Sequence, residues 1–514
     1  MTWTETDGAL LEKLEAQILP GDAPIEKRLL AEIVPGFSLA VLNNYEVTWT
    51  KTYGVRDNSA YGAERKHVDS ETLFQAASIS KTLTAFAVLR LVDQGVLDLD
   101  KDVHTYLKKW KFPAGSPTVT LRLLLSHRAG VNVSGYPGFA RGNPDIPDIV
   151  TSLNGEGSTT TSKVVIDSVP GIAEKYSGGG YSVVQVVLED VVGKPFDELM
   201  DELVLKPCGM HRSTFKLCTA EPPSDNTASG HMFGPASVGG GFLVYPEMAA
   251  AGLWTTPAEL ARFAMAIGQS VRQVLPSVVE AEAAEDVVKF DGPLLSPSAA
   301  KEFITIPGMA GEHTGDSKGM ALGVNVAGRN ERMRLSHAGG NHGFLSNMEI
   351  NPFSGFGSVI MYNGHDESYS IRRQVISALG GIYKWPDTAE SKDTSQNGGA
   401  KTEEMAKEVD WNLLSGTYKT DENREIIVSA DSTCSFPPFA KGPFTLKRKR
   451  DNKFEIVGLT ESSLEFEFEE AEKTGEDAAA TKGSAAVSVA YASSQSGGEA
   501  WAAPSTVTAK RVKG

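Results

Sequence analysis

The sequence predicts an α/β protein in which helices cover an antiparallel sheet, followed by a small all-β barrel. Strand-like runs occur near both ends of the segment 30–380 and helix-like segments lie between them, which is typical of such a domain. Near residue 386 the composition shifts to Thr, Ser, Gly, Lys and Glu, which indicates a linker. Beyond this linker, apolar residues tend to occur at every second position. We therefore predict a mixed domain over residues 1–385, a linker over 386–409 and a barrel over 410–514.

The mixed domain is expected to begin with an amphipathic helix and a β-hairpin. Up to about Val34, apolar residues recur among acidic ones, at Leu10, Leu11, Leu14 and Ile18. The apolar runs 37–42 and 47–50 then flank the turn residues Asn43 and Asn44, which is the pattern of a hairpin. This hairpin supplies the first two strands expected of the sheet.

Helix-like segments fill the middle of this domain, and three strands follow them. The expected helices include residues 78–94, 120–127 and 181–193. The expected strands are 334–337, 344–350 and 357–362. In the first of the helices apolar residues recur at intervals of three, and the glycine at position 95 suits its end.

The C-terminal part contains short runs in which apolar and polar residues alternate. These runs are 425–428, 444–446, 454–457, 464–468, 486–489 and 506–508. Roughly seven or eight short strands in about one hundred residues indicate a small β-barrel or sandwich.

Composition and charge argue against several classes of partner. The 514 residues are 41% hydrophobic and 22% charged, as expected of a soluble globular protein with two or three domains. A net charge of −16 argues against nucleic acid or an anionic membrane surface. The N-terminus lacks the basic flank and apolar core of a secretory signal, and no apolar run reaches the ~18–20 residues of a membrane span. We therefore expect a cytoplasmic protein.

Cysteines and ligand motifs imply neither a disulfide framework nor a cofactor. Cys208, Cys218 and Cys434 are too few for such a framework in a chain of this length. Cys208 and Cys218 could pair, and the alternative is that both are ordinary buried thiols. Neither a metal-ligand spacing such as H-E-x-x-H nor a phosphate- or dinucleotide-binding glycine motif occurs.

Three S-x-x-K patterns offer candidates for a serine nucleophile, and they start at Ser78, Ser213 and Ser298. An unassisted serine reacts poorly at neutral pH, but a neighbouring neutral amine can take its proton. Because residues three apart share one face of a helix, Lys81 can reach Ser78, and the helix N-terminus favours oxyanion charge. About two accidental matches are expected in a chain of this length, so the pattern alone does not choose among the three.

Two further segments contain the base and the oxyanion donors that acyl transfer by serine requires. Residues 176–181 read Tyr-Ser-Gly-Gly-Gly-Tyr, and a phenol held beside cationic groups loses its proton more readily and can act as a base. Residues 337–340 read His-Ala-Gly-Gly on an expected strand, where glycines permit close approach of a ligand. Taken singly, the first segment could be a turn with packed tyrosines, and the second a strand-end histidine bonded to backbone groups.

Together and in this order, S-x-x-K, Y-S-G and H-A-G resemble the motifs of the serine β-lactamase and penicillin-binding protein superfamily. The histidine of the third motif is most similar to the class C-like branch, which holds D-aminopeptidases, esterases and acyltransferases. Residues 123–131, 206–215 and 251–256 resemble further segments of that branch. The resemblance covers roughly residues 30–380 and implies a β-lactamase/DD-peptidase-like catalytic domain. It places Ser213 inside another family segment and leaves Ser298 without partners.

The resemblance implies a serine hydrolase that cleaves an amide or ester bond of a small-molecule or peptide-like substrate through an acyl-enzyme. Ser78 would be the nucleophile, Lys81 its activator and Tyr176 the base that returns the proton to the leaving group. His337 would orient the tyrosine or bind a substrate carboxylate or carbonyl. The backbone N–H groups of Ser78 and Gly340 would form the oxyanion hole. No metal is implied.

Position 178 departs from the family pattern. The second motif is usually Y-x-N, and Gly178 stands where that asparagine contacts the acyl group and the lysine. Loss of this donor would cost about 1–3 kcal/mol of orientation unless another side chain enters the space. We therefore expect that β-lactams are hydrolysed only weakly, and that the substrate has a bulkier or differently shaped acyl group. Gly178, Gly339 and His342 are expected to contact the substrate, and His342 could replace the missing polar contact.

The sequence leaves two other functions open: an acyltransferase using the same acyl-enzyme, and a binding or sensing protein without turnover. Residues 410–514 resemble the lipocalin-like barrels appended to some of these hydrolases, which pack on the catalytic domain and can restrict its cleft. A ligand-carrying barrel is the alternative. The expected partner is a small-molecule or peptide-like substrate, and the chain could also form homo-oligomers.

Overall fold

The structure is a computed structural model. The residues that it describes are 12–15, 25–31, 34–58, 65–157, 161–232, 236–275, 290, 294–307, 318–364, 370–383, 416–420, 425–429, 433–436, 440–450, 453–456, 462–468, 485–491 and 506–511. The predicted linker, residues 386–409, lies outside them, as do Leu10, Leu11 and Ile18 of the predicted first helix.

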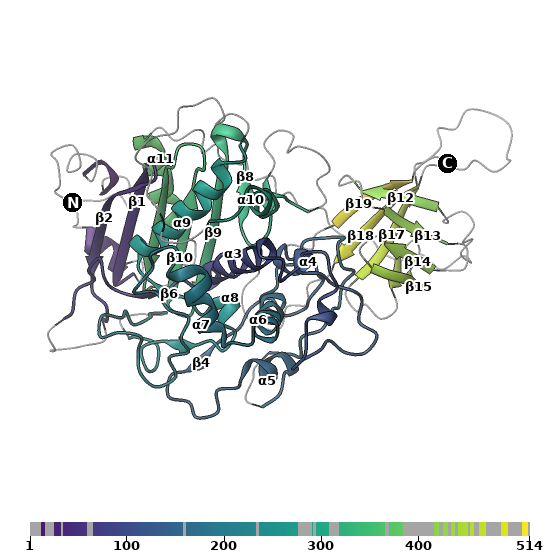
Figure 1. Ribbon diagram of the computed structural model, residues 1–514, viewed down its shortest axis with the longest axis horizontal. Helices are drawn as coiled ribbons and strands as arrows, with labels where there is room; N and C mark the ends of the chain where they lie inside the picture. Colours follow the sequence, from purple (N-terminus) through teal and green to yellow (C-terminus); the bar gives the residue numbers. More distant parts are fainter. Residues whose placement is uncertain are drawn as a thin grey trace.

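A seven-stranded sheet forms the centre of the mixed domain (Figure 1). In spatial order its strands are β2 (Glu46–Gly54), β1 (Gly36–Asn43), β11 (Gly357–Tyr362), β10 (Phe344–Ile350), β9 (Arg334–Asn341), β8 (Asn325–Ala327) and β7 (Lys318–Met320). Every neighbouring pair is antiparallel. The prediction of an antiparallel sheet built from strands at both ends of the domain is therefore confirmed.

The hairpin of β1 and β2 turns one residue later than predicted. Asn44 and Tyr45 have φ of 49° and 59°, the left-handed conformation that a two-residue type I′ turn needs at both positions. A bulky residue rarely adopts it, but the Tyr45 side chain is fully buried and its hydroxyl donates to the Pro352 carbonyl. Tertiary packing thus fixes a turn that local sequence placed at Asn43 and Asn44.

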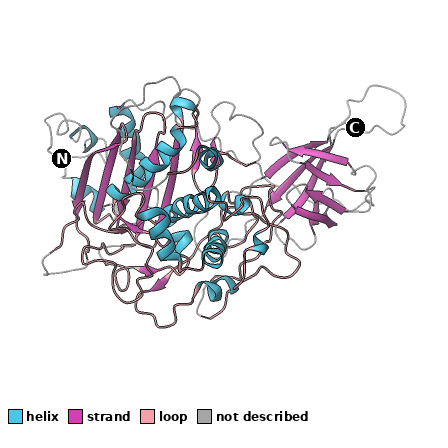
Figure 2. Ribbon diagram, viewed as in Figure 1, coloured by secondary structure: helices cyan, strands magenta, loops and turns pink. Residues whose placement is uncertain are grey.

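Helices cover both faces of the sheet, as predicted (Figures 1 and 2). On one face α2 (Ile25–Ala31) and α11 (Ser370–Tyr383) share a buried apolar cluster with β1 and β11. On the other face α9 (Pro257–Arg272) crosses β11, β1, β10 and β2. Gly268 permits the close approach of α9, because a Cβ there would lie 2.8 Å from the Ile350 side chain.

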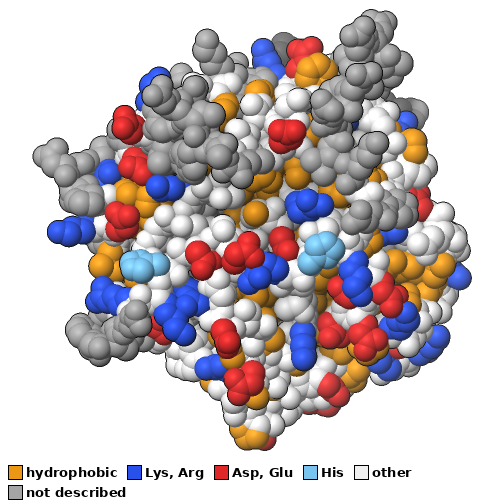
Figure 3. Space-filling model, turned by 60° about the vertical axis from the view of Figure 1, so that its left-hand side comes forward, with side chains coloured by type: hydrophobic (Ala, Val, Ile, Leu, Met, Phe, Trp, Pro, Cys, Tyr) orange, Lys and Arg blue, Asp and Glu red, His pale blue; other side chains and the backbone are white. Residues whose placement is uncertain are grey.

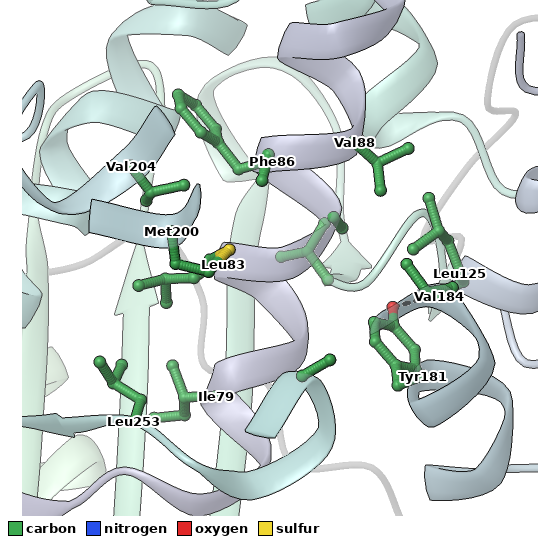
Figure 4. Packing of buried hydrophobic residues seen from close by; sticks show 14 of the residues in the cluster. Ile79, Leu83, Phe86, Val88, Leu125, Tyr181, Val184, Met200, Val204 and Leu253 are labelled. Atoms are coloured by element: carbon green, nitrogen blue, oxygen red, sulfur yellow. Dashed lines mark hydrogen bonds between the residues drawn. The ribbon is translucent and has the colours of Figure 1, made fainter. Parts of the chain in front are cut away.

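Of the other described helices, α6 (Gly178–Val192), α7 (Phe196–Met200), α8 (Met248–Ala251) and α10 (Pro297–Ile304) contact α3 (Ser80–Asp93). The short helices α4 (Leu121–Leu125) and α5 (Ile149–Asn154) pack against α6. Figure 4 shows Ile79, Leu83 and Phe86 on the side of α3 that faces Met200, Val204 and Leu253. Val88 lies on the side of Leu125, Val184 and Tyr181. Because α3 is buried nearly all round, it carries no polar face.

The first turn of α6 is held by hydrogen bonds to its own cap residue and to a distant loop. Ser177 caps the helix, its Oγ accepting from the Gly180 N–H at 3.0 Å. The N–H groups of Gly178 and Gly179 donate to the Ser134 and Val133 carbonyls, each at 2.9 Å. With its free N–H groups paired in this way, the helix begins at residue 178, three residues before the predicted start at 181.

Eight C-terminal strands are hydrogen-bonded in a closed order, in which β12 pairs with both β13 and β19. They are β12 (Gly416–Thr420), β13 (Glu425–Val428), β14 (Thr433–Phe436), β15 (Ala440–Arg450), β16 (Lys453–Ile456), β17 (Ser462–Phe468), β18 (Ala485–Tyr491) and β19 (Thr506–Arg511). The six runs with a period of two overlap these strands. All neighbouring pairs are antiparallel.

Charges of both signs are interspersed on the face drawn in Figure 3, and apolar side chains form small groups there. A mixed surface of this kind produces no strong single-sign field over that face. Among the helices that the structure describes, none is both long enough and apolar enough to cross a membrane.

Candidate active site

Ser78 lies in a short 3₁₀ turn, Ala77–Ile79, that leads directly into α3. Ala77 has a φ of 49°, a conformation that an alanine rarely adopts, so the chain turns sharply just before the serine. Ala77 and Ile79 are fully buried, whereas Ser78 is partly exposed. The turn therefore presents the Ser78 hydroxyl at the surface of an otherwise buried segment.

Lys81 is hydrogen-bonded to Ser78, as its spacing predicts. The Lys81 Nζ donates to the Ser78 Oγ at 2.9 Å and to the Ala250 carbonyl at 2.8 Å. The lysine is only 2% exposed, so its amine meets these two oxygens and aromatic rings rather than bulk water. An amine in this position can accept the serine proton in its neutral form, and in its protonated form it stabilises the serine alkoxide.

The ring of Tyr176 also lies beside the lysine. The Lys81 Nζ is 5.0 Å from the centre of the Tyr176 ring. Tyr176 is 37% exposed, and no hydrogen bond joins its hydroxyl to another residue in the described part of the chain. The phenol is therefore within reach of both the lysine and an entering substrate. The structure thus brings the predicted Ser78, Lys81 and Tyr176 together.

His337 lies on β9 and is 3% exposed. Burial, and next the positive charge of Lys81, lower the pKa of His337 to about 4, so its imidazole is neutral at pH 7. Its Nδ1 is 2.6 Å from the Ala338 carbonyl oxygen, which can only accept, so Nδ1 carries the proton. The buried Nε2 is then a hydrogen-bond acceptor, and it has no partner among the described residues.

The glycines after His337 allow β9 to approach the segment that precedes Ser78. A Cβ on Gly339 would collide with the Ala76 carbonyl oxygen and with the Ser346 Oγ. β8 pairs with β9 only as far as Ser336, and beyond that residue no strand in the described part of the chain lies along the outer edge of β9. Gly340 is exposed on this stretch. The predicted oxyanion role of the Gly340 N–H stays a prediction.

His127 is a buried site residue to which the sequence analysis assigned no role. Its ring centre is 4.2 Å from that of Tyr176 and 5.3 Å from that of Tyr181. Burial, and next the charge of Lys81, hold the pKa of His127 well below its usual value. Its Nδ1 accepts from the Ser177 N–H at 3.0 Å, so the proton of the neutral ring is on Nε2. In the sequence, the only indication of a role for His127 was its place in the segment 123–131, which resembles a segment of the class C-like branch.

The space beside Gly178 is occupied by Tyr136. A Cβ on Gly178 would lie 3.1 Å from the Ser134 carbonyl oxygen and 3.2 Å from Cε2 of the Tyr136 ring. His342 instead lies exposed in the turn between β9 and β10, where its backbone N–H donates to the Tyr245 hydroxyl at 3.2 Å. The nearest side chain to this space is therefore that of Tyr136 and not that of His342.

The two other S-x-x-K serines lack the lysine contact. The buried Ser213 is hydrogen-bonded to Thr255, at 2.7 Å, and to Glu259, while Lys216 is exposed. Ser298 is exposed in the first turn of α10, and the cap of that helix is Ser296. Neither serine is placed as a nucleophile.

Cys208 and Cys218 are both buried free thiols, so these two residues do not pair. Burial raises the pKa of the Cys208 thiol to about 12, which keeps it protonated. Within the described residues no group of three or more His, Cys, Asp or Glu side chains is arranged to hold a metal ion.

Comparison with known proteins identifies relatives of this chain. A protein-family model described as Beta-lactamase matches residues 23–379. The Bacillus subtilis protein PbpX is 31% identical over 195 residues, which are 36% of this chain and 44% of PbpX. The chain thus spans less than half the length of this curated relative.

Two solved structures share the fold. The octameric penicillin-binding protein homologue from Pyrococcus abyssi is 18% identical with a TM-score of 0.54, over 97% of this chain and all of that chain. The D-amino acid amidase from Ochrobactrum anthropi SV3 is 18% identical with a TM-score of 0.52, over 73% of this chain and 98% of the amidase. At these identities the likeness concerns the fold.

Proposed function

Because the chain belongs to the beta-lactamase family, we propose that it is a serine hydrolase that cleaves an amide or ester bond through an acyl-enzyme on Ser78. The observation that carries this proposal is the 2.9 Å hydrogen bond between the buried Lys81 Nζ and the Ser78 Oγ, with the Tyr176 ring 5.0 Å from the same nitrogen. Nucleophile, activator and base thus lie around one point that remains open to solvent at Ser78 and Tyr176.

In the acylation step the Ser78 Oγ forms a bond to the substrate carbonyl carbon. Its proton passes through Lys81 and Tyr176 to the leaving nitrogen or oxygen, and the C–N or C–O bond breaks. Water then attacks the ester carbonyl, and its proton returns to Ser78 by the reverse path. The products are the acid and the freed amine or alcohol.

Two backbone N–H groups and one histidine would assist this step. The N–H groups of Ser78 and Gly340 would donate to the oxyanion. His337 would orient the Tyr176 hydroxyl by accepting from it, because its Nε2 is an unprotonated acceptor at neutral pH. A neutral acceptor does not attract a carboxylate, so of the predicted roles of His337 we retain the orienting one.

The substrate class that we propose is a small-molecule or peptide-like amide or ester. The fold shared with a D-amino acid amidase supports amides of D-amino acids as the first compounds to test. Because Gly178 has no side chain that could bind the acyl group, we expect β-lactams to be hydrolysed only weakly. Gly340 and His342 are both exposed, which supports a contact of each with the substrate.

A substrate panel tests the proposal. D-amino acid amides, short-chain esters and a chromogenic β-lactam would be assayed with wild type and Ser78→Ala, and with added amines or alcohols as alternative acyl acceptors. Hydrolysis that requires Ser78 supports the hydrolase. A dominant product with the added acceptor would reassign the protein as an acyltransferase. A burst of leaving-group release without steady-state turnover would indicate a binding or sensing protein.

Two properties of the whole chain are part of the proposal. The closed order of β12–β19 supports a barrel within residues 410–514, and we propose that it is lipocalin-like and packs on the catalytic domain. The octameric state named for the Pyrococcus abyssi protein supports a homo-oligomer. Light scattering after size-exclusion chromatography would measure the oligomeric state, and a monomer at micromolar concentration would contradict the second point.

A further inference from the structure

We propose that Tyr136 determines which acyl group the site accepts. In this proposal its ring takes the place of the side chain that position 178 lacks, and the site selects acyl groups with an apolar surface over those with an amide next to the scissile carbonyl. The proposal rests on the proposed function, since it concerns the acyl group that Ser78 would carry.

The position of the Tyr136 ring is the first argument. Gly178 is two residues after Tyr176, so a side chain at position 178 would project next to the base. The φ of Gly178 is not in the left-handed region, so an L residue would fit the backbone there. Such a residue would meet the Ser134 carbonyl oxygen at 3.1 Å and the Tyr136 ring at 3.2 Å, both tighter than ordinary van der Waals contact, and of the two only the ring belongs to a side chain. Tyr136 and a side chain at position 178 therefore compete for one space.

The loop that carries Tyr136 is fixed in place. The Ser134 carbonyl accepts from the Gly178 N–H at 2.9 Å, and the Val133 carbonyl accepts from the Ser177 Oγ at 2.9 Å. These bonds join the loop to the first turn of α6, which follows the base. The ring is thus part of the wall beside Tyr176 and not a mobile surface group.

The Tyr136 hydroxyl is hydrogen-bonded to a residue of α6. It is 2.8 Å from the Ser182 Oγ, which in turn donates to the Gly178 carbonyl at 3.2 Å. Burial, and next the nearby Glu247 carboxylate, raise the pKa of Tyr136, so the phenol stays neutral. With its hydroxyl held by Ser182, the group that Tyr136 offers an acyl chain is its half-buried ring.

The chemistry of this wall favours apolar acyl groups. Gly178 offers no side-chain donor or acceptor, and an aromatic ring cannot satisfy an amide that loses its water on binding. A polar group left without a partner in a closed site is disfavoured, whereas an aliphatic or aryl chain gains contact with the ring. Within the proposed class, the preferred substrate is therefore an ester or amide whose acyl group has an aliphatic or aryl chain and no amide next to the scissile carbonyl.

A matched pair of substrates tests the proposal directly. The 4-nitrophenyl esters of 4-phenylbutanoate and of N-benzoylglycine have the same leaving group and acyl chains of equal length, but only the second has an amide. We expect wild type to favour the first in kcat/KM by about tenfold or more, the effect of one unpaired hydrogen-bonding group. Tyr136→Phe should keep this ratio, because the ring and not the hydroxyl carries the selectivity.

Exchanging the two side chains should reverse the preference. In Tyr136→Ala/Gly178→Asn the freed space admits an amide side chain, and the ratio of the two kcat/KM values should shift by about tenfold or more toward the N-benzoylglycyl ester. Gly178→Asn alone should lose activity on both esters, because its side chain meets the ring. Tyr106→Ala is the matched control, since Tyr106 is also a half-buried tyrosine with a hydrogen-bonded hydroxyl.

The outcomes separate this proposal from the proposed function. A ratio that is unchanged in the double variant and in Tyr136→Ala, with both variants folded by circular dichroism, would overturn the role of Tyr136. An organophosphorus probe would be applied in parallel. If it labels Ser78 in these variants, the nucleophile is intact and only the selectivity argument fails. If it does not label Ser78 in wild type, the proposed function fails instead.

Discussion

Gly339 of β9 lies so close to Ala76 that a Cβ on the glycine would overlap the Ala76 carbonyl oxygen. The same oxygen accepts a hydrogen bond from the Ser346 Oγ at 2.8 Å. The sheet therefore contacts the segment that precedes Ser78 at the Ala76 carbonyl, through the backbone of Gly339 and the side chain of Ser346. This contact fixes the distance between His337 and the serine, because both belong to the two segments that meet there.

Gly339→Ala should consequently reduce activity more than it reduces stability. The added methyl pushes β9 away from the turn at Ala77–Ile79, and a displacement of about 1 Å at a catalytic site can lower the rate by about a hundredfold. Steady-state kinetics with the best ester measures this change. Gly381→Ala is the control, since Gly381 lies in α11 with open space around its Cα and should lose no activity.

Lys81→Met should lower kcat/KM by about a thousandfold, because general base assistance contributes about 10²–10⁴. Methionine has nearly the length of the lysine and fills the same buried space, so the fold should persist. Thermal unfolding would verify this. A Lys81→Met enzyme with more than a tenth of wild-type kcat/KM would contradict the role of Lys81 as activator.

His337 should make stability depend on pH between about 4 and 6.5. Its pKa is lowered to about 4 in the folded protein, so between these values the unfolded chain binds a proton that the folded chain does not. The free energy of unfolding therefore falls as the pH is lowered through this window, by roughly 3 kcal/mol at most for this group, at about 1.4 kcal/mol per pKa unit.

His337→Asn removes this proton and keeps an N–H that can donate to the Ala338 carbonyl. We expect its unfolding free energy, measured with urea from pH 4 to 7, to vary less with pH than that of wild type. His211→Asn, at an exposed histidine, should follow the wild-type curve. Parallel curves for wild type and His337→Asn would show that the histidine is not buried as described.

His127 should act by positioning Tyr176. His127→Asn keeps an acceptor for the Ser177 N–H and tolerates the φ of 57° at this position. His127→Leu removes the acceptor and should destabilise the protein by about 1–3 kcal/mol. Both variants lose the ring that stacks on Tyr176, so both should lower kcat with little change in KM. Equal loss of stability in the two variants would argue against the Ser177 hydrogen bond.

The fold could be predicted to a large extent because its elements have strong local patterns. The strands at 334, 344 and 357 begin at the predicted residues, and the last two are rich in apolar residues and bounded by turns. The start of α6 was missed by three residues. Its glycines carry no helical signal, and what makes them helical is the pairing of their N–H groups with the distant Ser134 and Val133 carbonyls.

Contacts between site residues could be predicted where the residues are a few positions apart in the sequence. Contacts that depend on the tertiary structure were missed. The Ser78–Lys81 pair follows from the helical repeat. By contrast, Tyr136 reaches Gly178 through a loop, and no spacing in the sequence links positions 136 and 178. The neutral state of His337 also depends on burial in the folded protein, which a strand-end histidine in a sequence does not reveal.

The central claim is that Ser78 is the nucleophile. Peptide mass spectrometry after treatment with a fluorophosphonate probe tests it most directly, together with turnover of the ester panel. The predicted result is a single label on Ser78 in wild type, with neither label nor turnover in Ser78→Ala. A label on Ser213 or Ser298, or full turnover by Ser78→Ala, would contradict the account.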